Sequence, residues 1–178
     1  MEIADGIYVV KNLYPPDLCA AYLLMSERIG YEAAPINSSM GVFVNPQYRN
    51  NARIILDDEE MAEEIWLPVA EHLPNSLDGR RAVGLNERLR FYRYDVGQKF
   101  EAHIDGYYRR PNGEQSWLTF MLYLNEDFEG GETNFMSGTS VKPETGMVLA
   151  FQHRLMHEGA AVTKGRKYVL RSDVMFSL

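Results

Sequence analysis

The sequence predicts a mainly β domain with flanking α-helices, whose core is a sandwich or barrel. Helix-like runs occur only in the N-terminal half, whereas from Leu85 onward short aromatic and β-branched runs alternate with Gly, Asn, Asp and Pro. A length of 178 residues suits one domain, and no linker or repeat divides the chain. We therefore expect a single domain over 1–178, with a helical support region at 1–84 and the β core at 85–178.

The N-terminal half predicts one short strand and two helices. IYVV, residues 7–10, is the strand. PPDLCAAYLLMSERIG, residues 15–30, begins with two prolines and ends in glycine, as helices commonly start and stop. DDEEMAEEIWLPVAEHLP, residues 57–74, opens with acidic residues that suit a helix N-terminus and ends in proline. Pro68 predicts a kink in this second helix.

The C-terminal half predicts a series of strands: LRFYRY, KFEAHI, WLTFMLYLN, GETNF, MVLAFQH, HEGAAV and KYVLRSDVMF. Alternate residues of a strand point to opposite sides of its sheet. One side of WLTFMLYL is purely apolar and is expected to pack against the helices: Leu118, Phe120, Leu122 and Leu124. The other side is mixed and predicts the lining of a pocket, or alternatively a half-exposed sheet face: Trp117, Thr119, Met121 and Tyr123.

The charge and cysteine content argue against several classes of protein. A formal net charge of -7 argues against nucleic acid as a partner. The arginines between Arg80 and Arg110 form either a locally positive face or, as we favour, solvated side chains on several surfaces. The single cysteine, Cys19, cannot form an internal disulfide, and no segment suits a signal peptide or a membrane span. We expect a cytoplasmic protein without a membrane partner.

A candidate metal site lies in FEAHIDGYYRR, where His103 and Asp105 are two residues apart. In a strand their side chains share one face, with roots roughly 6.5 Å apart. A third ligand must come from elsewhere, and we interpret His72 as a surface residue. FQHRLMHEG offers His153 and His157, of which we prefer His157. Two imidazoles and one carboxylate are the facial triad of non-haem iron oxygenases.

Lys167 stands ten residues beyond His157, on the last predicted strand. An oxo-acid cosubstrate would need a fixed cation for its far carboxylate, and Lys167 is a candidate because a buried lysine is rare unless it is paired. Taken without the triad, it is an ordinary exposed strand residue.

Four segments, in this order, resemble the iron(II)- and 2-oxoglutarate-dependent dioxygenases of the prolyl 4-hydroxylase-like group: YDVGQKFEAHIDG, LTFMLYLNEDFEGGETNF, VKPETGMVLAFQHRLMHEG and GRKYVLRSDVMF. The resemblance runs from about Leu89 to Phe176. It implies a double-stranded β-helix, or jelly roll, as the catalytic core, with the N-terminal helices packed on one sheet. It also implies iron(II) and 2-oxoglutarate as cofactors, with ascorbate as a further candidate.

The resemblance also implies roles for individual residues. The implied iron ligands are His103, Asp105 and His157. The implied 2-oxoglutarate residues are Lys167, Tyr123, Tyr94 and, as a rival to the lysine, Arg171. Arg171 shares the strand face of Lys167 because four is an even separation.

The implied reaction is hydroxylation of an unactivated C–H bond with O2, releasing succinate and CO2. Asp105 favours hydroxylation over halogenation, because relatives that halogenate lack this carboxylate. A peptidyl proline is the implied substrate, and another protein side chain or a small molecule are alternatives. Segments 106–117 and 38–53 are candidates for substrate recognition. The rival functions are a zinc-dependent hydrolase and a non-catalytic metal-binding or sensing module.

Overall fold

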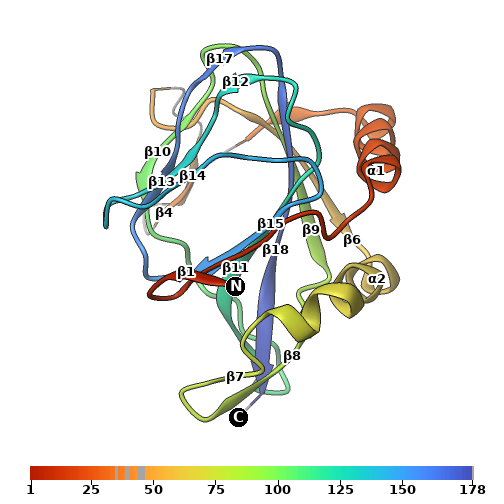
Figure 1. Cartoon of the computed structure of the whole chain (residues 1–178), viewed down its shortest axis with the longest axis vertical. Helices are drawn as coiled ribbons and strands as arrows, with labels where there is room; N and C mark the ends of the chain where they lie inside the picture. The colour runs from red at the N-terminus through yellow and green to blue at the C-terminus, as the bar shows by residue number, and fades with distance from the viewer. Residues whose placement is uncertain (35, 39–40, 44–46, 178) are drawn as a thin grey trace.

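The chain forms two packed β-sheets with helices on one side, as the computed structural model in Figure 1 shows. The structure describes residues 1–34, 36–38, 41–43 and 47–177. The helices are α1 (Pro16–Ile29) and α2 (Glu59–Val69), and α2 is followed by the 3₁₀ turn η1 (Ala70–His72). The strands are β1 (Glu2–Ala4), β2 (Ile7–Val10), β3 (Glu32–Ala33), β4 (Ile36–Ser38), β5 (Gly41–Phe43), β6 (Ala52–Asp57), β7 (Ser76–Leu77), β8 (Arg80–Leu85), β9 (Arg88–Tyr94), β10 (Phe100–His103), β11 (Gln115–Tyr123), β12 (Glu129–Gly130), β13 (Thr133–Phe135), β14 (Ser140–Val141), β15 (Val148–Gln152), β16 (His157–Gly159), β17 (Val162–Lys164) and β18 (Lys167–Ser177).

The larger sheet has the order β1-β2-β15-β11-β18-β9-β6-β3, with β8 beside the far end of β18 and β7 beside β8. The smaller sheet has the order β10-β16-β13-β14. In Figure 1 the smaller sheet lies to the left of the larger sheet, and both helices lie to the right of the larger sheet. The pairings between these strands are antiparallel, and this two-sheet arrangement is the expected jelly roll.

Both predicted helices form, and their ends have local causes. The chain enters α1 at a pair of prolines and leaves it at Gly30, which has φ 93° and donates its N–H to the Ser26 carbonyl at 3.1 Å. The Asp58 carboxylate caps α2 by accepting the N–H of Met61 at 2.9 Å. The α-helix continues through Pro68 for one residue only and then tightens into η1.

The apolar face of β11 packs beneath the helices, as its alternation predicts. Leu118, Phe120 and Leu122 are fully buried in one cluster with Ile65 of α2 and Cys19 of α1. Complete burial of such a side chain stabilises the fold by roughly 1.5–3 kcal/mol. This core fixes the larger sheet against the helices and leaves its opposite face for the pocket.

The structure adds strands to the region expected to be a helical support. The added strand β6 pairs with β9 and belongs to the larger sheet, as does the expected strand β2, which pairs with β15. The added strand β8 crosses the expected boundary at residues 84 and 85. Trp117 also differs from expectation. A register shift between Ser116 and Leu118 interrupts the alternation, and Trp117 packs against the helix-side cluster with Arg80 5.1 Å above its ring.

Candidate metal and cosubstrate site

His103, Asp105 and His157 come together at neighbouring strand ends. His103 ends β10 and is paired in register with His157, the first residue of β16, while Asp105 follows β10. One ligand atom from each of the three side chains lies within 4.8 Å of the other two. The Nε2 atoms of His103 and His157 each lie 3.7 Å from an oxygen of Asp105. The arrangement suits a single ion bound by two imidazoles and one carboxylate.

Backbone carbonyls fix both imidazole rings. His103 Nδ1 lies 2.7 Å from the Glu101 carbonyl oxygen, and His157 Nδ1 lies 2.9 Å from that of Leu155. Because a carbonyl can only accept, Nδ1 carries the hydrogen in each ring and the Nε2 lone pair is free for a metal. Burial lowers the pKa of His103 to about 4 and also lowers that of His157. Both rings are therefore neutral, as metal ligation requires.

Asp105 is held ionised and oriented by two neighbours. The Thr119 hydroxyl donates to its Oδ2 at 2.5 Å, and Arg171 lies 3.1 Å from its Oδ1. Burial alone would raise the pKa of Asp105, but Arg171, together with the two histidines, holds it well below its usual value.

His153 is buried beside the site but lies outside the metal-competent cluster of the described residues. Its Nδ1 lies 2.9 Å from the oxygen of Thr119, and its Nε2 lies 2.9 Å from the hydroxyl of Ser116. Because the Thr119 hydrogen points to Asp105, His153 donates through Nδ1 and accepts through Nε2. His153 thus holds the Thr119 hydroxyl in the orientation in which it donates to the Asp105 carboxylate.

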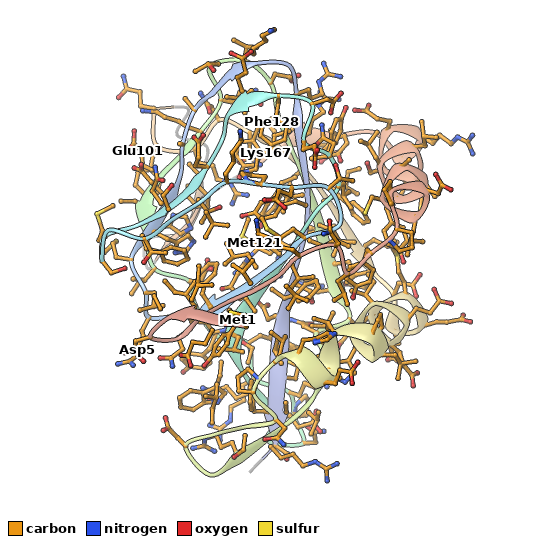
Figure 2. The ribbon with its side chains drawn as sticks, viewed as in Figure 1. Met1, Asp5, Glu101, Met121, Phe128 and Lys167 are labelled. Carbon is orange, nitrogen blue, oxygen red and sulfur yellow. The ribbon has the colours of Figure 1, made fainter. Side chains whose placement is uncertain are left out.

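The cluster opens into a cavity of ≈ 440 Å³ between the two sheets, which Thr119, Met121, Tyr94 and Lys167 also line. Figure 2 shows Met121 and Lys167 in the interior, well separated from the surface residue Asp5. The mixed face of β11 therefore lines the pocket at Thr119 and Met121.

Lys167 is only 2% exposed, and no described acidic side chain lies within ion-pair distance of it. Its ammonium donates to the Gly131 carbonyl at 2.6 Å and lies 5.2 Å and 5.4 Å from the ring centroids of Tyr94 and Tyr123. Burial lowers the pKa of Lys167 to about 7. A buried lysine with spare donors is a ready partner for a carboxylate.

The other predicted cosubstrate residues differ in their surroundings. Tyr94 lines the cavity, whereas Tyr123 is fully buried behind it, with its hydroxyl 2.7 Å from that of Thr133. Arg171 lies on the same face of β18 as Lys167, but its charge is engaged by Asp105 and by Asp173 at 3.3 Å.

Tyr92 also lines the cavity and was not expected there, whereas Arg49 and Arg53 belong to the segment 38–53 that was expected to take part in recognition. The sequence analysis assigned the arginines after Arg80 to solvated surfaces, which is wrong for Arg90 because this residue also lines the cavity. The available signal was the alternation in LRFYRY, which places Arg90, Tyr92 and Tyr94 on one side of β9.

The two candidate recognition segments both reach the cavity. In 106–117, Tyr107 and Tyr108 line its mouth, and ion pairs from Arg110 to Glu87 and Glu114 order the turn behind them. In 38–53, residues 39–40 and 44–46 lie outside the described part of the chain, and Tyr48, Arg49 and Arg53 line the cavity.

Comparisons with known proteins agree with this geometry. The sequence model of the 2OG-Fe(II) oxygenase superfamily matches residues 89–172. Probable prolyl 4-hydroxylase 9 of Arabidopsis thaliana is 32% identical over 160 residues, which cover 74% of this chain and 51% of that protein. The chain spans between 39% and 60% of the length of three such curated relatives.

Two solved structures share the fold. The viral collagen prolyl hydroxylase of Paramecium Bursaria Chlorella virus-1, in its 2OG complex, has a TM-score of 0.66 at 19% identity, over 98% of this chain and 99% of that one. The prolyl hydroxylase of Trichoplax adhaerens, in complex with a hypoxia inducible factor oxygen degradation domain peptide fragment, has a TM-score of 0.75 at 15% identity, over 96% of this chain and 84% of that one.

Fold and site together define a jelly-roll protein with a His-Asp-His cluster suited to a metal. The family model and the curated relatives support a 2OG-Fe(II) oxygenase that is prolyl hydroxylase-like. In the part of the chain that the structure describes, no helix is both long and apolar enough to cross a bilayer.

Proposed function

We propose that the protein is an Fe(II)- and 2-oxoglutarate-dependent dioxygenase that hydroxylates a prolyl C–H bond of a peptide or protein and releases succinate and CO2. One observation carries this proposal. The three candidate ligands, with donor atoms within 4.8 Å of one another, share a cavity with the buried, unpaired Lys167.

The donor set fits iron(II). His103 and His157 would contribute Nε2 and Asp105 a carboxylate oxygen, and a facial set of this kind leaves open positions. When bound, iron and 2-oxoglutarate supply the oxidising power for C–H hydroxylation. The contribution of the protein is to hold ligands and substrate in position and to keep water out.

Lys167 is the residue we assign to the distal carboxylate of 2-oxoglutarate. Its ammonium has spare donors and no ionic partner in the described part of the chain, whereas the guanidinium of Arg171 is already shared between two carboxylates. Tyr94 lies beside the ammonium at the cavity wall, and Tyr123 packs behind it.

Several contacts make the site rigid before any ligand binds. Phe100 stacks on His103 with a centroid distance of 3.7 Å, and Phe151 packs against His157 at 4.4 Å. Together with the carbonyl contacts at Nδ1, this packing holds both rings ready for metal, which reduces the entropy lost on binding.

The prolyl substrate is proposed from the relatives, several of which are named prolyl 4-hydroxylases, and from the Trichoplax structure with its peptide fragment. The cavity mouth suits a peptide, because Ile104, Tyr107 and Tyr108 expose apolar surface there. Ascorbate as an additional cofactor and a cytoplasmic location stay predictions. The buried single thiol of Cys19 agrees with a reducing compartment.

A zinc hydrolase is the main alternative, and Lys167 argues against it. Activation of a zinc-bound water needs no buried cation lining the same cavity, and burying one is costly. A non-catalytic metal-binding module would show no turnover, which distinguishes it from an oxygenase.

Anaerobic reconstitution with Fe(II) tests the proposal. Addition of 2-oxoglutarate should produce the weak visible charge-transfer band of its iron chelate, and admission of O2 with prolyl peptides should yield succinate and a peptide gaining the mass of one oxygen atom. Absence of both the band and oxygen-dependent succinate contradicts the assignment. Turnover of an ester or amide with zinc, but none with iron, would support the hydrolase instead.

A further inference from the structure

The wall of the cavity formed by β18, β9, β6 and the residues preceding β6 is strongly basic, although the chain as a whole carries a net charge of -7. Four arginines line it: Arg49, Arg53, Arg90 and Arg171. Converging like charges are destabilising unless anions neutralise them. Stability alone therefore gives no reason to gather them, and the partners of each charge matter.

Arg90 and Arg171 are neutralised within the protein. Both lie 3.3 Å from an oxygen of Asp173, and Arg171 also contacts Asp105. Arg49 and Arg53 differ, since no described acidic side chain lies within ion-pair distance of either. Two positive charges of the wall are therefore left for a ligand.

Arg49 has the features of a built site. It is only 6% exposed, and its guanidinium lies between two rings, 4.7 Å from the centroid of Tyr92 and 4.4 Å from that of Phe100. Its Nε donates to the Asn51 side chain at 2.7 Å, but its Nη2 is buried without a hydrogen-bond partner among the residues that the structure describes. A buried unpaired guanidinium N–H is costly, and a bound oxyanion would satisfy it.

Arg53 lies next to Arg49 on the same wall. It is paired in register with Tyr92, so the two side chains share the inner face of the larger sheet. Burial lowers the pKa of Arg53, and the charges of Arg49, Arg90 and Arg171 lower it further. The same arginines outweigh burial at Tyr92 and lower its pKa to about 8. All of these groups line the same cavity, which is the geometric reason for their mutual effects.

This region is distinct from the cosubstrate end of the cavity. β9 separates β6 from β18, so the backbone of Arg53 lies roughly 10 Å or more from that of Lys167 at about 4.8 Å per strand. Lys167 is itself available for 2-oxoglutarate. The second cationic centre is therefore left for the substrate.

We propose that the substrate carries an oxyanion, a carboxylate or a phosphate, that binds Arg49 and Arg53 next to the proposed iron site. The inference rests on the proposed function and narrows its substrate class. It favours an acidic residue or a phosphorylated residue near the target proline over a neutral proline-rich repeat. A carboxylate and a phosphate would bind the two arginines through the same kind of charged hydrogen bond, and the experiment below distinguishes between them.

The test uses anaerobic protein loaded with Fe(II) and saturated with 2-oxoglutarate. Four short capped peptides share one proline, followed respectively by alanine, asparagine, aspartate or phosphoserine, and their Kd values are measured by calorimetry. We expect the aspartate peptide, the phosphoserine peptide or both to bind on the order of ten- to a hundredfold more tightly than the two neutral peptides. The tighter of the two acidic peptides identifies the oxyanion.

Variants connect the preference to the arginines. Arg53→Gln should remove most of the binding preference for acidic over neutral peptides, and Arg53→Lys should restore part of this preference. Arg28→Gln, on the exposed face of α1, should leave the preference intact. Thermal unfolding of each variant checks its folding, and Arg49→Gln is an independent second variant.

Three results overturn the inference. The first is equal binding of all four peptides, or absence of binding by both acidic peptides. The second is a preference for acidic peptides that survives both Arg53→Gln and Arg49→Gln. The third is loss of 2-oxoglutarate affinity in the Arg53→Gln variant, which would assign this arginine to the cosubstrate. Failure of the wild-type protein to give the 2-oxoglutarate band is a different result, since it removes the proposed function itself.

Discussion

Arg171 lies 3.1 Å from Asp105 and 3.3 Å from Asp173, so one guanidinium joins a candidate iron ligand to a carboxylate on its own strand. Lys167, four residues earlier on the same face of β18, has no such partner among the described residues. The two cations thus differ in availability although they share a strand and a cavity. This difference underlies the first prediction.

Lys167→Ala should weaken 2-oxoglutarate binding on the order of 10²- to 10³-fold, because it removes one side of a desolvated ion pair. Titration of the charge-transfer band under anaerobic conditions measures the change. Lys167→Arg keeps the charge and should retain part of the affinity. A normal Kd for Lys167→Ala would transfer the role to Arg171.

The affinity for 2-oxoglutarate should fall as the pH rises through about 7, because burial lowers the pKa of Lys167 to about 7 in the free protein. Below this pH the ammonium is already charged. Above it, the lysine is neutral and must take up a proton to pair with a carboxylate, so binding is accompanied by proton uptake.

Calorimetry in buffers of different ionisation enthalpy should show uptake approaching one proton at about pH 8.5. Lys167→Arg, which remains charged, is the matched control and should show none. Equal proton uptake by both proteins would mean that another group titrates.

His157→Ala should abolish iron binding and the charge-transfer band, whereas His153→Ala should lower metal affinity by no more than about ten- to a hundredfold. The reason is positional, because His157 belongs to the cluster and His153 acts through Thr119. Iron content after gel filtration and anaerobic titration measure both effects. The reverse ranking would show that His153 is the ligand.

Gly146→Ala should destabilise the fold more than Gly79→Ala. The two glycines have nearly the same backbone conformation, φ +74° and +75°, but a Cβ at Gly146 would overlap the Tyr14 carbonyl oxygen whereas Gly79 faces open space. Alanine at φ > 0 costs about 1–2 kcal/mol in either position. Crowding should add roughly 1–3 kcal/mol at Gly146.

Urea unfolding with a common m-value measures the difference between the two variants. Equal destabilisation would show that the chain near Tyr14 yields easily to the added methyl group.

Much of the fold follows from local patterns. Period-two alternation identified β11 and its buried face, and prolines, Asp58 and Gly30 mark the helix ends. The strands missed by the sequence analysis include β6 and β8. ARIILD of β6 runs directly into an acidic helix start, and RRAVGL of β8 carries charges and Gly84. Both are strands because β9 and β18 offer them open edges, which is a tertiary cause.

The residues of the candidate site likewise fall into a group that local sequence predicts and a group that depends on tertiary contacts. Spacing and strand geometry were enough to suggest His103 and Asp105, whose convergence is local. The segment that carries Arg49 and Arg53 was a recognition candidate, but their convergence on Tyr92 could not be predicted, because these contacts cross between segments far apart in the chain. The bulge that redirects Trp117 likewise depends on how β11 is paired with β18.

β18 is held along its length by β11 on one side and by β9 and β8 on the other. Lys167, Arg171 and Asp173 alternate on it with Tyr168, Leu170 and Val174, which belong to the helix-side core. Insertion of a single residue immediately before Lys167 would exchange these two sets and place charges under the helices. The site residues and the core residues thus depend on the same register of this strand. Selection for either set therefore also prevents insertions and deletions within β18.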